Sequence, residues 1–401
     1  MDIPERFKLL LVLMSTGFLG NLLVIYYLQK GFTYGQIGLI SALSALGFFL
    51  FEIPTGVVAD RVSRKTSVLI GIAIFSLGTL LLIFLRNFPM LIAYVLISSL
   101  GATFVSGSLQ AWLFDNLKHL GIEEKFREVM KDAKSLSLLL SAVTLPLGAF
   151  LAQFYGFTLP LAMTLGVELA MLLVALSIPE YEFKKPEVSY HLHVLGSMRE
   201  LFKHDVLWLV LFSIFVGISM NQFRKFFEPY LGEMLAKSLG TTLMGTLGLL
   251  GVIEVLIKNI PRLLGVRLKD EWSRKTYGLA PVLTPLLTLL SAIYMNPLFV
   301  VVLGMVAALV NAAFAFNFSV EFQHRIPSEK RATITSLDMM LSAIVMATFY
   351  TAYGFVVDLV GLREARLVFA VALLGIGVAF KVIQALGVLG DALELRHLAE
   401  E

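Results

Sequence analysis

Long apolar stretches separated by short polar connections fill most of the chain, and they limit its fold more than any other feature. A stretch of about 20 apolar residues is long enough to cross a bilayer as a helix. Hydrophobic residues make up 58% of the 401 residues and charged residues only 15%, with a mean hydropathy of +0.83. A soluble protein of this length could not bury so much apolar side chain. The pattern therefore predicts an all-α integral membrane protein with twelve transmembrane helices.

The polar connections divide these stretches into two sets of six. The longest polar segment, residues 179–205, is a predicted cytoplasmic linker between an N-terminal half at 1–178 and a C-terminal half at 206–401 with a short charged tail. The first stretch is too long for the core of a signal peptide, so we expect it to remain in the protein. The predicted helices cover residues 7–28, 35–58, 66–85, 90–114, 133–155, 157–178, 206–231, 239–264, 277–295, 298–322, 332–360 and 367–389.

A charged phrase marks the connection between the second and third predicted helices. Residues 52–66 read E-I-P-T-G-V-V-A-D-R-V-S-R-K-T, and residues 265–276 repeat the Gly-Val, the Asp and the Ser-Arg-Lys-Thr with one extra residue. A repeat at about half the chain length indicates two related halves, which is typical of secondary transporters.

The first copy of this phrase has the order G-x-x-x-D-R-x-x-R-K, which resembles the signature loop of the major facilitator superfamily. Ser63 stands where that loop usually has a glycine. The resemblance extends over the whole chain, and it implies two pseudo-symmetric six-helix halves that rock around a central cavity. The signature residues are Gly56, Asp60, Arg61, Arg64 and Lys65 in the first copy and Gly265, Asp270, Arg274 and Lys275 in the second.

Asp60 is the signature residue for which we predict a conformational role. It follows a predicted helix C-terminus, where the helix dipole disfavours an anion. The resemblance implies that its partner is the start of the eleventh helix, at residues 332–335. We predict that Asp60 and its neighbouring cations latch the cytoplasmic side shut when the carrier opens outward. The alternative is that the cations only fix the topology. We interpret the copy around Asp270 as a structural relic.

The distribution of basic residues predicts the orientation. With residue 1 inside, 25 of the 32 Lys and Arg residues fall in cytoplasmic segments and 7 in outer ones. Such an excess places both termini in the cytoplasm of a multi-pass protein of the cytoplasmic membrane. The cations assigned to the outer connections are Lys30, Arg86, Arg224, Lys225, Lys237, Arg363 and Arg366.

Ionisable residues inside membrane helices are costly and often functional. Glu168 lies near the middle of the sixth helix, where a carboxyl group could carry a proton, but the resemblance places this helix away from the cavity. Glu254 and Lys258 are four residues apart on the eighth helix and share one face, either as an ion pair or as coupling groups. Glu52 lies close to the cytoplasmic face. These four residues are the candidates for proton or charge coupling.

Polar residues on the first, fourth, seventh and tenth helices are candidates for substrate contacts, because those helices line the cavity in the family that the chain resembles. An asparagine in a membrane helix also serves as a hydrogen-bond partner between helices, and both interpretations stay open. Arg224 and Glu228 share the same four-residue spacing on the seventh helix. The candidates are Asn21, Gln110, Asn221, Arg224, Asn311 and Asn317.

The sequence lacks the motifs that are typical of several classes of activity. The chain has no cysteine, which excludes disulfides, thiol catalysis and thiolate metal sites. It has no phosphate-binding G-x-x-x-x-G-K-[ST] loop. No nucleophile–base pair or set of metal ligands occurs at one membrane depth, and the six histidines fall in or next to cytoplasmic segments. We expect neither an enzyme, nor a bound metal or cofactor, nor a nucleic-acid partner.

The interpretation that follows is a monomeric secondary active transporter for a small solute in a lipid bilayer. Mostly apolar helices favour efflux of an amphipathic or hydrophobic compound, with protons as the candidate counter-ion. The fourth helix lacks the arginine of proton-coupled exporters in the resembled family, and the fifth keeps Pro146 but only a displaced glycine. The alternatives are proton-coupled uptake of a small metabolite, an uncoupled facilitator or lipid mover, and a receptor on a carrier fold.

Overall fold

The computed structural model describes residues 2–181, 204–265, 270–325 and 331–385, and every regular element within these ranges is a helix. Contacts between residues group the chain into two compact units. Unit 1 comprises Met1–Glu187 and Thr241–Val255, and unit 2 comprises Val188–Gly240 and Leu256–Glu401.

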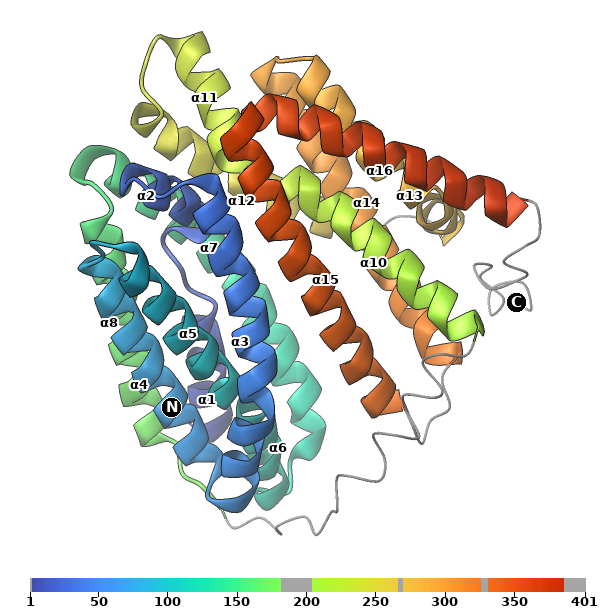
Figure 1. The fold of residues 1–401 in the computed structure, drawn as a ribbon. Coiled ribbons are helices and arrows are strands. Elements are labelled where there is room, and N and C mark those ends of the chain that lie inside the picture. Colours follow the sequence, from blue (N-terminus) through green and yellow to red (C-terminus); the bar gives the residue numbers. More distant parts are fainter. Residues whose placement is uncertain (1, 182–203, 266–269, 326–330, 386–401) are drawn as a thin grey trace. The chain divides into compact units, whose positions relative to one another are not determined.

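Unit 1 is a bundle in which α4 packs against α3, α5 and α8, while α1 packs against α7 and α8 (Figure 1). At one end of the bundle, α1, α4, α5, α6, α7 and α8 share an apolar core, in which the rings of Phe7 and Trp112 meet edge to face at 4.9 Å. The helices of this part are α1 (Ile3–Met14), η1 (Gly20–Leu22), α2 (Leu23–Gln29), α3 (Tyr34–Arg61), α4 (Arg64–Ile83), α5 (Phe88–Val105), α6 (Ser108–His119), η2 (Glu123–Lys125), α7 (Phe126–Tyr155) and α8 (Thr158–Ser177).

Small residues allow close helix approaches in unit 1. A Cβ on Gly71 of α4 would lie 2.9 Å from the carbonyl oxygen of Gly101, and a Cβ on Gly101 of α5 would lie 3.0 Å from that of Gly71. The two glycines therefore face each other where α4 crosses α5. Without a hydrophobic driving force between helices in lipid, such close backbone contact is a main source of helix association.

The first predicted membrane helix is not continuous. It is divided into α1, of 12 residues, and the pair η1 and α2, of which α2 has 7 residues. The Ser15 and Thr16 hydroxyls donate back to the carbonyls of Leu11 and Val12 at 3.1 and 2.9 Å, and Gly20 has a φ of +48°. Hydroxyls that bond the preceding turn and a left-handed glycine end a helix locally. The expectation of one helix over 7–28 is wrong for this reason.

Unit 2 has α13 packed against α10, α14 and α16 (Figure 1). A Cβ on Gly377 of α16 would lie 2.1 Å from the carbonyl oxygen of Pro281 on α13, so these two helices also touch through backbone. The remaining helices are α10 (His204–Arg224), α11 (Phe227–Leu239), η3 (Met244–Thr246), α12 (Leu247–Gly265), α13 (Asp270–Ile293), α14 (Pro297–Arg325), α15 (Arg331–Val360) and α16 (Leu362–Ala385).

The seventh predicted helix is also divided. α10 ends at Arg224, and Phe226 adopts a left-handed conformation with φ 57°, the only described non-glycine residue with a positive φ. α11 then begins at Phe227. Arg224 and Glu228 therefore lie on different helices, and the inference that their spacing places them on one helix face is wrong.

The helix α12 contributes to both units. Its first part packs on α7 in unit 1, where the Gly248 N–H donates to Gln153 Oε1 at 2.9 Å. One turn further, a Cβ on Gly251 would lie 2.4 Å from the Cβ of Ala149. From Leu256 onward the helix belongs to unit 2.

Nine helical segments of the described chain are long and apolar enough to cross a membrane, and the bent pair Trp208–Leu239 and Met244–Asn259 adds a tenth. The predicted number is twelve, so the helix type is confirmed but the full count is not. The division of the first helix contributes to this difference, because neither of its pieces approaches the length of about 20 residues that a membrane requires.

Candidate functional site

The signature loop is the short connection between α3 and α4, and Ser63 is its central residue. Ser63 has an extended backbone and caps α4, since its hydroxyl oxygen accepts the N–H of Thr66 at 2.9 Å. Serine is among the best residues for capping a helix N-terminus. The departure from the usual glycine thus provides a cap for the helix that follows.

Arg64 and Lys65 attach this loop to two neighbouring helices of unit 1. The Arg64 guanidinium forms an ion pair with Asp115 on α6 and donates to the Ala111 carbonyl at 3.1 Å. The Lys65 Nζ donates to the carbonyl of Ile178 at 2.6 Å, just beyond the C-terminus of α8. A cation at a helix C-terminus is favoured by the helix dipole.

Glu180 completes this network and is a residue that the sequence analysis missed. Its carboxylate accepts the backbone N–H of Lys65 at 3.0 Å and the hydroxyl of Ser63, so it lies at the N-terminus of α4. The adjacent Pro179 carbonyl accepts Trp112 Nε1–H at 3.1 Å. Glu180 is 115 residues from Lys65 in sequence, and no local pattern connects the two.

The ion pair between Arg64 and Asp115 yields a stability prediction. The two side chains are 20% and 23% exposed, so solvent screens the pair in part. We expect Asp115→Asn to lower the free energy of unfolding by about 1 kcal/mol, the upper end for a partly exposed pair. The measurement is thermal unfolding of the purified protein in detergent. Asp132→Asn is the control, because Asp132 is half exposed and lies 3.8 Å from Lys8. An equal effect of both variants would contradict this account.

The remaining signature residues are placed by their backbone. Gly56 lies inside α3, and Asp60 and Arg61 form its last turn, with side chains outside the described part. In the second copy Gly265 ends α12, whereas Asp270 is the first residue of α13 rather than the end of a preceding helix. The two aspartates therefore occupy opposite kinds of helix terminus. Lys275 is exposed on α13, and the Arg274 side chain lies outside the described part.

Glu254 of α12 lies against the break in the first helix. Its Oε1 accepts the backbone N–H of Asn21 at 3.3 Å, and both carboxylate oxygens lie 3.1 Å or less from the position of a Cβ on Gly20. Glu254 is 8% exposed, whereas the Asn21 side chain is exposed. The structure thus brings together two residues that the sequence analysis assigned to coupling and to substrate contact.

Glu168 lies in a second polar cluster of unit 1. Its Oε1 accepts the Thr79 hydroxyl of α4 at 2.8 Å, and its Oε2 is buried without a hydrogen-bond partner among the described residues. Tyr94 of α5 lies near this carboxyl and is in hydrogen-bond contact with Ser98 and with Tyr27 of α2. The tyrosines were not predicted, because nothing in their local sequence separates them from other aromatic residues of membrane helices.

In unit 2 the structure brings Asn221 of α10 together with Tyr350 of α15. The Tyr350 hydroxyl donates to Asn221 Oδ1 at 2.7 Å, and Lys225 Nζ lies 4.5 Å from the centre of the Tyr350 ring. Tyr350 is 129 residues from Asn221 in sequence and was not predicted. Arg224 is exposed at the end of α10.

The other candidates are distributed over several helices. Asn317 is 4% exposed and donates to the Ala313 carbonyl of its own helix at 2.8 Å, whereas Asn311 is half-buried. Gln110 is exposed in the first turn of α6. Glu52 is exposed on α3, and Lys258 is half-buried on α12. Within the described ranges, no group of three or more His, Asp or Glu residues is arranged to hold a metal ion.

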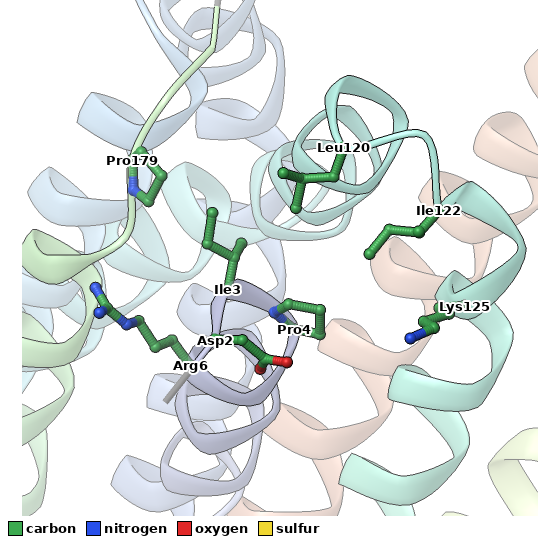
Figure 2. Close-up of a pocket in the computed structure, with 8 residues that line it drawn as sticks. All are labelled: Asp2, Ile3, Pro4, Arg6, Leu120, Ile122, Lys125 and Pro179. Carbon is green, nitrogen blue, oxygen red and sulfur yellow. The ribbon is translucent and has the colours of Figure 1, made fainter.

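A hollow at the N-terminus of α1 contains none of these candidates (Figure 2). Two of its polar side chains already serve the fold. Asp2 caps α1 by accepting the Glu5 N–H at 3.0 Å, and Arg6 donates to the Ser177 carbonyl at 2.6 Å. The lining residues are Asp2, Ile3, Pro4, Arg6, Leu120, Ile122, Lys125 and Pro179.

Comparison with known proteins gives three findings. Residues 9–349 match the family model described as Major Facilitator Superfamily. An uncharacterized MFS-type transporter of Bacillus subtilis (strain 168), YxaM, is 23% identical over 242 residues, which cover 57% of this chain and 58% of that protein. The chain thus matches just over half the length of this relative.

Two crystal structures of the nucleoside transporter NupG resemble the chain along almost its whole length. One has a TM-score of 0.77 at 16% identity and covers 96% of this chain and 99% of that one. The other, of a point mutant of the same transporter, has a TM-score of 0.76 at 17% identity and covers 95% and 100%. At this level of identity the likeness concerns the fold.

Proposed function

Because the chain belongs to the Major Facilitator Superfamily and is a carrier rather than an enzyme, we propose that it expels an amphipathic or hydrophobic compound by alternating access. Alternating access requires two related halves that rock around a central site. The half-length repeat in the sequence supports this mechanism. The orientation with both termini in the cytoplasm follows from the positive-inside rule and is part of the proposal.

The chemistry of the candidate cavity residues carries the choice of substrate. Five of the six candidate residues are uncharged amides, and Arg224 is the one cation among them. A sugar phosphate or a nucleotide carries negative charges that several cations would have to compensate. The available amides are Asn21, Gln110, Asn221 and Asn311.

We propose that protons drive the efflux and that Glu254 is the coupling residue. A coupling group must change its contacts when it gains a proton, and Glu254 accepts a backbone N–H at a helix break. Protonation removes negative charge from this contact. Glu168 lies on α8, a helix that the family resemblance places at the periphery, so it is the weaker candidate.

The test uses the purified protein in liposomes that contain a pH-sensitive dye. We expect addition of a lipophilic cation or a neutral amphipathic drug to move protons, and Glu254→Gln to reduce this movement to background. Glu168→Gln and Glu52→Gln are the controls and should retain it. Binding of a compound without any proton movement, in the parent protein, would exclude proton-coupled efflux. Proton flux that persists in Glu254→Gln would mean that a residue other than Glu254 couples protons to transport.

Uptake of a small polar metabolite is the second candidate function. The pair of Asn221 and Tyr350 offers an amide and an aromatic ring on adjacent helices, which is a combination that recognises a planar heterocycle. The structurally similar NupG is a nucleoside transporter. Accumulation of labelled uridine in cells that express the chain, lost in Asn221→Ala and Tyr350→Leu, would favour uptake over efflux.

A further inference from the structure

The hollow at the N-terminus of α1 has no role in the proposed function (Figure 2). It has a volume of about 600 Å³ and is open to the surface of unit 1. Small-molecule sites in proteins have volumes of about 300–1,000 Å³. The hollow is therefore large enough to hold a ligand, and the chemistry of its walls selects the kind of ligand.

Two capped helix ends fix the walls of the hollow. On one side α6 ends in a Schellman motif, in which Gly121 has a φ of +67° and the Ile122 N–H donates to the Leu117 carbonyl at 2.9 Å. On the other side α1 begins at the cap formed by Asp2, whose carboxylate accepts the Glu5 N–H at 3.0 Å. The walls are thus in place before a ligand binds, which lowers the entropic cost of binding.

Apolar side chains make up most of these walls. Leu120 is the most accessible of them that the structure describes as a large exposed apolar residue, with 42% of its surface exposed. The apolar lining residues are Ile3, Pro4, Leu120, Ile122 and Pro179. Such walls favour a ligand that has an apolar part.

Two cations border the apolar walls. Arg6 and Lys125 lie on opposite sides of Ile3 and Pro4 (Figure 2). Arg6 Nη1 donates to the Ser177 carbonyl at 2.6 Å, which fixes the position of this cation. Lys125 is exposed, and none of the ion pairs between described residues includes it. Among the described lining residues Asp2 alone has a carboxylate, so the lining carries more positive than negative charge.

The hollow lies at the depth where a membrane-spanning helix of unit 1 ends. α8 is a candidate span of 20 residues, which is the length that crosses the hydrocarbon core of a bilayer. Pro179 follows two residues after its end, and the bond to the Ser177 carbonyl holds Arg6 at the same depth. The polar headgroups of lipids begin where the hydrocarbon core ends. Lipid phosphates are therefore the anions nearest to Arg6.

We propose that this hollow binds the headgroup of an anionic phospholipid. Arg6 and Lys125 attract the phosphate, and the apolar walls contact the glycerol backbone and the first methylenes of the lipid. Basic pockets at the ends of membrane helices recognise anionic headgroups in this way. A zwitterionic phospholipid fits less well, because it brings a cation of its own. The site does not depend on what the chain transports.

The test is thermal unfolding of the purified full-length protein in detergent micelles with increasing amounts of phosphatidylglycerol, or of phosphatidylcholine in a parallel series. A ligand that binds the folded state raises the melting temperature in a saturable way. We expect this rise with phosphatidylglycerol and almost none with phosphatidylcholine. In Lys125→Gln, half of the rise should need about fivefold more phosphatidylglycerol, since one basic residue near a membrane surface contributes about 1 kcal/mol.

Lys131→Gln is the matched control for Lys125→Gln. Lys131 is exposed on the same helix, α7, six residues beyond the helix's start at Phe126 minus one, and it does not line the hollow. Its variant should respond to phosphatidylglycerol as the parent does.

Asp2→Asn tests the same site with the opposite sign. Asparagine caps a helix about as well as aspartate, so this variant keeps the fold of α1. It removes the carboxylate from the lining, and half of the rise should then need several-fold less phosphatidylglycerol. The result decides the matter even if a change at a cation disturbs the fold.

Protection of Lys125 from acetylation locates the bound lipid. Phosphatidylglycerol should slow the acetylation of Lys125 several-fold, measured by mass spectrometry of peptides, and phosphatidylcholine should not. Lys131 provides the internal reference, because its acetylation should be the same with both lipids.

Three results would overturn the proposal. Equal rises with both lipids would mean that the headgroup charge is not recognised. A response to phosphatidylglycerol that is the same in the parent, Lys125→Gln and Asp2→Asn would mean that the lipid binds elsewhere. An equal rise with sodium phosphate in micelles without lipid would mean that the ligand is a soluble phosphate and not a phospholipid.

Discussion

Gly148→Ala is expected to destabilise the protein by about 3 kcal/mol, the upper end for overpacking of a well-packed interior. A Cβ at this position of α7 would lie 1.8 Å from the carbonyl oxygen and 2.5 Å from the carbonyl carbon of Phe18. Both atoms belong to backbone at the break of the first helix, so no side-chain rotation can relieve the clash. Thermal unfolding and the yield of monodisperse protein in detergent measure the effect.

The sign of this effect makes it diagnostic. Alanine in a helix interior is favoured over glycine by roughly 0.5–1 kcal/mol, so a loss of stability must come from the contact. Gly166→Ala in α8 is the control, because a Cβ there meets nothing within 4 Å. It should leave the stability unchanged or raise it slightly. A Gly148→Ala variant as stable as Gly166→Ala would show that α7 does not approach the break closely.

Asp60→Asn is expected to reduce transport by up to about thirtyfold while folding and membrane insertion stay nearly normal. A carboxylate at a helix N-terminus contributes up to about 2 kcal/mol, which corresponds to a shift of about thirtyfold between two conformations. The reason for the prediction is the family resemblance, in which this residue bonds the start of α15 in one conformation. Substrate flux into or out of liposomes, normalised to the inserted protein, measures it.

Asp270→Asn provides the comparison for Asp60→Asn. Asp270 begins α13, whereas Asp60 lies in the last turn of α3, so the repeat does not preserve the helix terminus at which the aspartate sits. We expect Asp270→Asn to transport at a rate close to that of the parent. Equal transport by the parent and Asp60→Asn would contradict the latch. It would favour the alternative, in which the basic residues of the signature loop only fix the topology.

The class of fold could be predicted because it depends on local properties of the chain. Long apolar stretches predict membrane helices, and the match to the family over residues 9–349 confirms the class. Continuity within a helix was harder to predict. The break near Gly20 depends on serine and threonine hydroxyls that bond to the preceding turn, and hydropathy does not record this chemistry.

Single polar residues could be chosen as candidates from the sequence, but the residues that they contact could not be predicted. Asn21 and Glu254 were each singled out as costly polar groups in apolar helices, yet they are 233 residues apart, and nothing in the sequence joined them. The same holds for Asn221 and Tyr350. Because one tyrosine among the aromatic residues of a membrane helix looks like any other, the partner of a polar group is visible only after folding.

Arg366 illustrates the difference between what the sequence determined and what only the tertiary structure decided. By itself the sequence determined that this is a helical membrane carrier, because hydropathy and a signature loop are properties of neighbouring residues. Arg366 lies at the edge of an apolar stretch, and the same reasoning assigned it to a solvent-exposed connection. Only the tertiary structure decided that Arg366 is buried, since its partners Phe223 and Ser291 lie 143 and 75 residues away on other helices. Burial is a property of what surrounds a side chain, and the surroundings of Arg366 exist only when α10, α13 and α15 pack against α16.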